Sequence, residues 1–192
     1  MAKKYEFKPD KAPSALASWL HLSQLQRRHL LRWVLYGVLL VALSALQDVL
    51  LSRFRPFGIA TELVPVAIFL ICILEGPERG SVFSLISACI YLFSGSAAGT
   101  YSIVFITALA ILVTLLRQSY LQKGFGAAML CTVAAMVIYE MAVFAIGLFL
   151  GFTTLGRAGN FFLTAVFSLL AAPALYPVAI AIGKIGGAPW KD

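Results

Sequence analysis

Long apolar runs separated by short polar breaks dominate the pattern of this chain. A transmembrane helix needs about 20 consecutive, mostly apolar residues, and most of these runs approach or exceed that length. We therefore predict an all-α membrane protein with about six transmembrane helices in one compact bundle. The runs cover residues 33–51, 63–74, 80–93, 101–116, 125–150 and 161–182.

The segment 63–116 forms the centre of this pattern, and the polar residues 75–80 break it once. After the break, small side chains recur at Gly80, Ser84 and Ala88. A small residue at every fourth position gives one helix a flat face that a second backbone can approach closely in lipid. We predict two tightly joined helices here, with these three residues as helix-packing or partner contacts.

The run 63–74 is short for a membrane span. Twelve residues rise only about 18 Å along a helix, whereas the hydrocarbon layer is about 30 Å thick. Either the helix begins earlier, near Ile59, and carries Glu62 at the outer surface, or residues 63–93 form a re-entrant pair. In the last run, Pro173 and Pro177 predict a kink.

Composition supports an integral membrane protein. Hydrophobic residues make up 61% of the chain and charged residues 12%, compared with about 45–50% and about 25% in soluble domains. We expect one domain, with a basic leader (1–32), a transmembrane domain (33–183) and a short tail (184–192). The cysteines Cys72, Cys89 and Cys131 lie in apolar runs without paired spacing, so we interpret them as buried hydrophobic residues.

The basic residues predict the orientation in the membrane. The net charge is +7, and seven of the fifteen basic residues precede the first apolar run, which is typical of a flank facing anionic lipid rather than nucleic acid. With six spans, both termini lie on one side. That side carries all basic residues except Arg53, Arg55 and Arg157, so the positive-inside rule places both ends in the cytoplasm.

The leader contains a second helical pattern. Leu16, Trp19, Leu20 and Leu25 recur at about helical spacing. This segment is either an amphipathic helix in the inner headgroup layer or a loosely ordered tail.

Candidate chemistry within the membrane is limited to Glu140. Between residues 33 and 182 it is the one acid clearly inside a long run, and neither histidine lies there. We expect no enzymatic activity, no cofactor and no metal. A carboxylate at membrane depth is usually paired, protonated or facing a polar cavity. Glu140 is therefore either a ligand, proton or partner site, or a protonated side chain hydrogen-bonded to Tyr139, Ser168 or Thr164.

The run 69–100 resembles the rod shape-determining membrane proteins of the MreD family. The matching features are Glu75 and Gly76 after Leu74, Gly80 opening a helix of small residues, and Gly99 closing the following loop. The basic leader and six spans are also similar. Three positions depart from the family: Ser84 and Ala88 replace frequent glycines, and Leu92 replaces an aspartate.

The resemblance implies a non-enzymatic subunit of the bacterial cell-elongation machinery in the plasma membrane. Such a subunit binds the single-span protein MreC within the membrane and supports MreB-linked peptidoglycan synthesis.

The MreD family is in turn similar in architecture to the substrate-binding S components of energy-coupling-factor vitamin transporters, which provides an alternative function. A vitamin binder should present polar and aromatic groups that converge at its outer end. The candidates for that role are Glu62, Ser96, Tyr101, Thr153, Thr154, Arg157 and Asn160.

Overall fold

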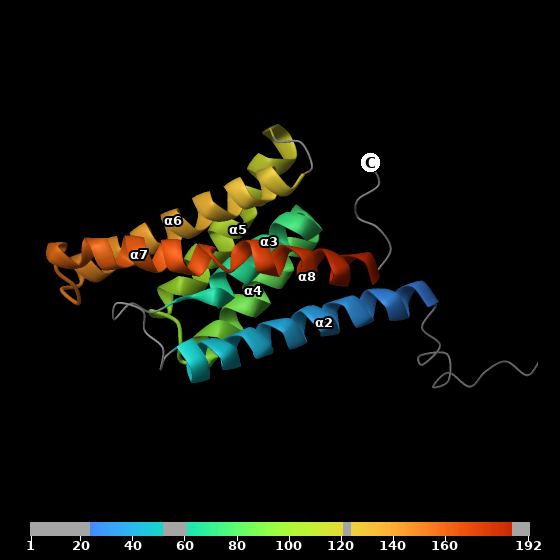
Figure 1. The fold of residues 1–192 in the computed structure, drawn as a ribbon, viewed down its shortest axis with the longest axis horizontal. Coiled ribbons are helices and arrows are strands. Elements are labelled where there is room, and N and C mark those ends of the chain that lie inside the picture. The colour runs from blue at the N-terminus through green and yellow to red at the C-terminus, as the bar shows by residue number, and fades with distance from the viewer. Residues whose placement is uncertain (1–23, 52–60, 121–123, 186–192) are drawn as a thin grey trace, which may run out of the picture.

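The computed structural model describes residues 24–51, 61–120 and 124–185, and these residues form a helical bundle (Figure 1). A five-residue π-helix, Gln47–Leu51, extends α2, and a 3-10 turn, Leu155–Arg157, precedes α7. The predicted amphipathic helix of the leader lies outside the described residues. The α-helices are α2 (Gln24–Leu46), α3 (Leu63–Glu75), α4 (Pro77–Phe93), α5 (Tyr101–Tyr120), α6 (Phe125–Phe149), α7 (Ala158–Leu169) and α8 (Ala172–Ile185).

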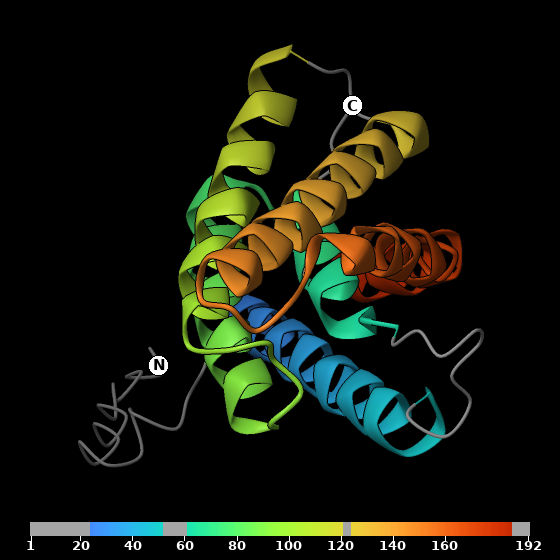
Figure 2. The same cartoon turned by 90° about the vertical axis from the view of Figure 1, so that its left-hand side faces the viewer.

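Helix α3 is the centre of the bundle. All 13 of its residues are buried, and it contacts α2, α4, α5, α6, α7 and α8. Figure 2 shows α3 enclosed by α2, α5, α6 and the α7–α8 pair. A helix that is apolar on every side has no polar face to leave uncovered, so burial on all sides is what its sequence requires.

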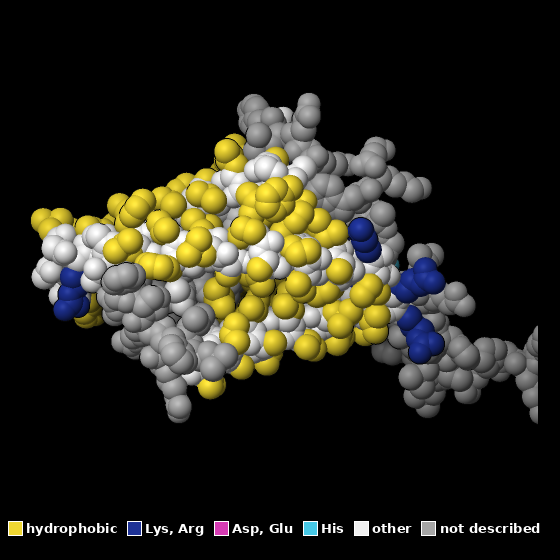
Figure 3. Space-filling model, in the orientation of Figure 1, with side chains coloured by type: hydrophobic (Ala, Val, Ile, Leu, Met, Phe, Trp, Pro, Cys, Tyr) yellow, Lys and Arg dark blue, Asp and Glu magenta, His cyan; other side chains and the backbone are white. Residues whose placement is uncertain are grey.

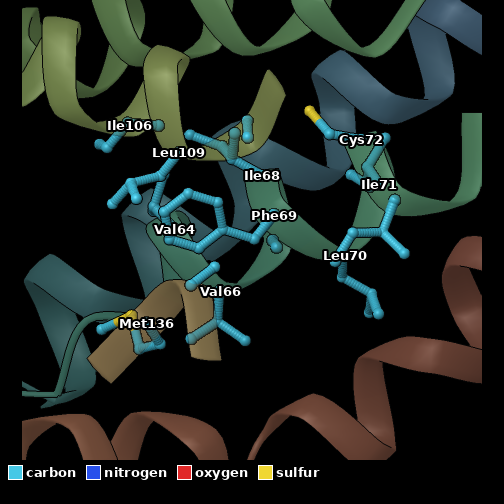
Figure 4. Close-up of a cluster of buried hydrophobic side chains, with 14 of the residues drawn as sticks. Val64, Val66, Ile68, Phe69, Leu70, Ile71, Cys72, Ile106, Leu109 and Met136 are labelled. Carbon is cyan, nitrogen blue, oxygen red and sulfur yellow. The ribbon is translucent and has the colours of Figure 1, made fainter. Parts of the chain in front are cut away.

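The side chains of α3 fill the core in several directions. Figure 4 shows them reaching toward Ile106 and Leu109 of α5 and toward Met136 of α6. Phe69 also meets Tyr139 of α6 edge-on, with ring centroids 6.2 Å apart. Dispersion contacts of this kind are individually small and collectively large.

The expected early start of this helix is wrong. Thr61 and Glu62 are not helical, and α3 begins at Leu63. A 13-residue helix rises only about 20 Å. The short length is tolerated because protein, rather than lipid, surrounds α3.

The outer helices carry the membrane-facing surface. Three segments are long and apolar enough to cross a membrane: Arg27–Val49, Tyr101–Ser119 and Phe125–Phe149. The pair Leu155–Leu169 and Ala172–Ile185 becomes a fourth if it counts as one bent span. In Figure 3 hydrophobic side chains cover most of the visible face between the two ends of the bundle. These features describe a multi-pass helical membrane protein, while the count of six crossings stays a prediction.

The predicted kink in the last run is confirmed, and its position lies before both prolines. Helices α7 and α8 meet at 45°, and the break falls at Leu170 and Ala171. Pro173 follows in the first turn of α8, where a missing N–H costs no hydrogen bond, and Pro177 lies inside α8. The bend therefore comes from starting a new helix ahead of Pro173.

The two ends of the bundle differ in charge. Figure 1 places the start of α2 and the end of α8 at the same end, and Lys and Arg side chains gather there in Figure 3. We call this end, which carries Arg27, Arg28, Arg79 and Lys184, the basic end. The opposite end, where α3, α5 and α7 begin, is called the far end.

Candidate functional site

A single residue separates α3 from α4. Gly76 has a φ of +92°, a conformation that favours glycine, and its N–H donates to the Cys72 carbonyl at 3.0 Å. Pro77 then starts α4, where its fixed φ suits the first helical turn. The loop residue Gly99 instead caps the start of α5, because its carbonyl accepts a hydrogen bond from the Ser102 N–H at 3.0 Å.

The predicted small-residue face packs inside the chain. A Cβ atom on Gly80 would lie 2.9 Å from the Cys72 carbonyl oxygen, and the Cys72 thiol donates to the Gly80 carbonyl at 3.1 Å. Ser84 and Ala88 continue the same face and are fully buried. Gly80, Ser84 and Ala88 thus act in internal packing, and a partner helix would have to use another face.

Glu75, predicted as part of the loop, is the last residue of α3 and forms a buried ion pair that sequence reasoning missed. Its Oε2 atom lies 3.2 Å from Nη2 of Arg32, and both side chains are fully enclosed. The Tyr36 hydroxyl donates to Glu75 Oε1 at 2.9 Å and lies 3.2 Å from the Ala179 carbonyl oxygen. These contacts join α2, α3 and α8. The sequence signal for this pair is Arg32, which directly precedes the first apolar run and which the prediction places in the leader.

A second arginine binds the same end of α3. The guanidinium of Arg117, on α5, donates to the carbonyl of Ile73. Carbonyls in the last turn of a helix have no partner within the helix, and cations are favoured there by the helix dipole. Arg32 and Arg117 together thus hold the C-terminal end of α3 at the basic end of the bundle.

A cavity of about 440 Å³ lies at the far end. It brings together the start of α3, the start of α5, the outer half of α6, the α6–α7 connection and α7. We call it the far-end cavity. Its lining residues are Glu62, Ala98, Tyr101, Glu140, Val143, Gly147, Phe152, Thr153, Arg157, Asn160, Phe161 and Thr164.

Most of the predicted ligand-binding residues meet in this cavity. Glu62, Tyr101, Thr153, Arg157 and Asn160 line it, whereas Ser96 and Thr154 do not. The hydroxyl of Ser96 instead donates to the Asp48 carboxylate at 2.5 Å.

Glu140, which the sequence alone could not place, also faces the far-end cavity. It is 2% exposed, and its Oε1 atom has no hydrogen-bond partner among the described residues. Among the described residues, Glu140 forms none of the expected hydrogen bonds to Tyr139, Ser168 or Thr164. Ser168 instead accepts from the Glu62 backbone N–H at 2.7 Å, and Thr164 donates to the Asn160 carbonyl at 3.0 Å.

Glu62 is the second carboxylate of the cavity. It is partly buried, and its Oε2 atom is enclosed without a partner in the described ranges. Burial raises the pKa of the Glu62 carboxyl above its usual range, because desolvation disfavours the charged form. Arg157 lies at the exposed rim and forms no ion pair with either glutamate in the described structure. Within the same residues, no group of three or more His, Cys, Asp or Glu side chains is arranged to hold a metal ion.

A second concave surface lies between α2 and α4. This groove of about 490 Å³ is mostly apolar, and Glu78 and Arg79 lie where α4 begins, toward the basic end. We call it the α2–α4 groove. Its lining residues are Trp33, Gly37, Leu40, Glu78, Arg79, Val82, Phe83, Ile86, Ser87 and Ile90.

Comparisons of the chain with protein-family models, with curated proteins and with solved structures found no match.

Proposed function

We propose that this chain is a non-enzymatic membrane subunit of the bacterial cell-elongation machinery, similar to MreD. In this role it binds an MreC-like single-span protein within the plasma membrane, with both of its own termini in the cytoplasm. Peptidoglycan synthases and MreB filaments are then contacted through that partner. The α2–α4 groove is the observation that carries the proposal.

The groove has the features that a transmembrane partner helix needs. Its floor is packed protein, because Leu40, Phe83 and Ser87 are buried. Its α4 wall is exposed, with Val82 at 60% and Ile86 at 56%. Gly37 presents no side chain and has open space around it, so a helix backbone can approach α2 closely there.

Charge at one end of the groove limits the orientation of the partner. Glu78 and Arg79 are exposed where α4 begins, toward the basic end. A single-span protein with charged residues just before its membrane helix would pair with them at the cytoplasmic surface. Its apolar segment would then follow Val82, Ile86 and Ile90 outward.

The connections at the far end also favour a partner with an extracellular domain. Residues 94–100 link α4 to α5, and residues 150–157 link α6 to α7. Both connections are too short to reach the cell wall. A subunit of this shape needs an extended partner to contact peptidoglycan synthesis outside the membrane.

Tryptophan substitutions in the groove test the proposal. Val82→Trp and Ile86→Trp fill the groove from exposed positions, so the core of the chain is left unchanged. Overpacking by about 1–3 kcal/mol corresponds to roughly a 5- to 150-fold loss of affinity. The measurement is co-purification, in mild detergent, of an MreC-like protein expressed from a neighbouring gene.

The matched control for the groove variants is Val104→Trp, on α5. Val104 is 67% exposed and lies outside the groove. The control should retain the partner at the level of the unchanged chain. Equal recovery of the partner with the groove variants and the control would contradict the proposed binding face.

The far-end cavity favours a second candidate function, binding of a small molecule as in the S component of an energy-coupling-factor transporter. Its volume of about 440 Å³ lies within the usual range of about 300–1,000 Å³ for ligand sites. Aromatic and polar side chains converge in it from several elements. Isolation with a transporter module or with a bound metabolite supports this candidate over the elongation subunit.

A further inference from the structure

We infer that the far-end cavity binds a small organic cation, a protonated amine with one positive charge, between the carboxylates of Glu62 and Glu140. The inference rests on the second candidate function, whose ligand chemistry it specifies. It is independent of partner binding in the α2–α4 groove.

Two enclosed acceptor atoms carry the inference. Glu140 Oε1 and Glu62 Oε2 are both buried, both belong to residues that line the cavity, and neither has a hydrogen-bond partner among the described residues. Buried polar atoms in folded proteins are nearly always paired, so a pair of unpaired acceptors beside a cavity points to a missing donor. An ionised carboxylate can only accept, and an ammonium group supplies only donors.

The positions of the two glutamates favour a ligand that enters from the far end. Glu62 precedes α3 and Glu140 lies within α6, so the carboxylates approach the cavity from different elements. A protonated amine between them would form charge-assisted hydrogen bonds, which are the stronger class. These bonds would form away from water, where a charge pair is weakly screened.

The walls of the cavity indicate an organic ligand. Val143, Phe152 and Phe161 provide apolar surface, and the ring of Tyr101 borders the same space. Aromatic faces attract organic cations. A bare metal ion would need more ligands, and the described residues contain no group of three or more side chains suited to a metal.

Arg157 limits the number of positive charges on the ligand. It lies at the exposed rim of the cavity that Glu62 and Glu140 line. A ligand with a second ammonium group at its outer end would meet the guanidinium and be repelled. Arg157 and Asn160 are instead suited to a neutral polar or acidic substituent, because a guanidinium and an amide both donate hydrogen bonds.

Direct binding to the purified full-length chain in lipid nanodiscs tests the inference. The probes are tyramine, its alcohol analogue tyrosol, and the corresponding acid, 4-hydroxyphenylacetic acid, which share one ring and differ in the terminal group. Binding is measured by calorimetry and by the shift in unfolding temperature. We expect tyramine to bind, and the alcohol and acid to bind at least tenfold more weakly.

Charge-removing variants identify the site. Glu62→Gln and Glu140→Gln keep the size of the side chain, and each should weaken tyramine binding at least tenfold. Unfolding temperatures without ligand check that both variants fold. The matched control is Asp48→Asn, because Asp48 is an exposed acid at the same end and does not line the cavity. It should bind tyramine like the unchanged chain.

The outcomes separate this inference from the function on which it rests. If the acid or the alcohol binds more tightly than tyramine, and this binding is lost in the glutamate variants, the cavity is a small-molecule site but its ligand is not a cation. Tyramine binding that persists in both glutamate variants places the amine elsewhere and overturns the site. If no probe binds and mass spectrometry of the purified chain finds no metabolite, both the inference and the second candidate function fail.

Discussion

Gly80 shows how one missing side chain sets the geometry of the core. The carbonyl oxygen of Cys72 would lie 2.9 Å and its Cα atom 3.0 Å from a Cβ atom at this position. These are backbone atoms of a helix enclosed on all sides, so they cannot move aside easily. The close approach of α3 and α4 therefore depends on glycine here.

Replacing Gly80 with alanine should lower stability despite the higher helix propensity of alanine. The expected cost is about 1–3 kcal/mol from overpacking, measured as a lower unfolding temperature in detergent. Gly126→Ala is the matched control, because Gly126 is also helical and has nothing within 4 Å of its added Cβ atom. That variant should be neutral or more stable by up to about 1 kcal/mol. Equal behaviour of the two variants would contradict the close contact.

Ligand binding in the far-end cavity should depend on pH. Burial raises the pKa of the Glu62 carboxyl, so this group takes up a proton at a higher pH than an exposed glutamate. Protonation removes the negative charge that the amine needs, and tyramine binding should weaken as the pH falls through that raised pKa. The other titratable or charged groups near Glu62 or lining the cavity are Tyr91, Tyr101, Tyr139, Glu140 and Arg157.

Calorimetric titrations of tyramine across the acidic to neutral range measure this dependence. In Glu62→Gln the remaining dependence should be smaller than in the unchanged chain. Affinity that rises as the pH falls would contradict the role of the carboxylates.

Between elements, the buried ion pair of Arg32 and Glu75 is a polar connection at the basic end. It joins α2 to α3, and Tyr36 extends it to the Ala179 carbonyl of α8. Breaking a buried pair leaves one charge uncompensated, which costs more than replacing both partners together.

A double-mutant cycle should reveal this coupling. Arg32→Met alone should destabilise the chain by about 3–5 kcal/mol, because Glu75 remains buried and unpaired. Adding Glu75→Gln to Arg32→Met should recover part of that loss. The measurement is thermal or denaturant unfolding in detergent for both single variants and the double variant. Simple additivity of the two single effects would argue against the pair.

Elements were predicted well from sequence where a run is long and uninterrupted. The runs 101–116 and 125–150 match α5 (Tyr101–Tyr120) and α6 (Phe125–Phe149) closely. The run 63–74 also matches α3, and only the alternative of an earlier start is wrong. That alternative assumed contact with lipid, but the length of a helix must match the bilayer only where the helix faces lipid. An apolar surface on every side is typical of a buried helix and of a membrane span alike, so the sequence of α3 does not distinguish protein neighbours from lipid.

The far-end cavity was partly predictable, because polar residues near the outer ends of several runs must converge if the runs form one bundle. That reasoning named Glu62, Tyr101, Thr153, Arg157 and Asn160, and it gave a ligand, proton or partner site as one of two alternatives for Glu140 without joining Glu140 to the other five. Ser96 was included wrongly, since its hydrogen bond to Asp48 depends on a contact between distant segments. The pairing of Arg32 with Glu75 was missed for the same reason.

For the molecule as a whole, the asymmetry of charge predicts one orientation in the membrane. A cysteine at Thr154, on the far-end connection, should react with a membrane-impermeant maleimide in intact spheroplasts. A cysteine at Gln118, exposed near the end of α5, should react only after the membrane is permeabilised. The unchanged chain provides the background from its own three cysteines, of which Cys72 and Cys131 are buried. The reverse labelling pattern would invert the orientation.

The position of α3 also has a consequence for how the chain is made. Helix α3 leaves the ribosome before α5, α6, α7 and α8, the later helices that will enclose it. Until α8 is synthesised, this apolar helix lacks one of its final neighbours and remains in contact with lipid or with the insertion machinery. The enclosure of α3 is therefore completed only when α8 is added, and a chain released before that step would expose α3 to quality-control proteases.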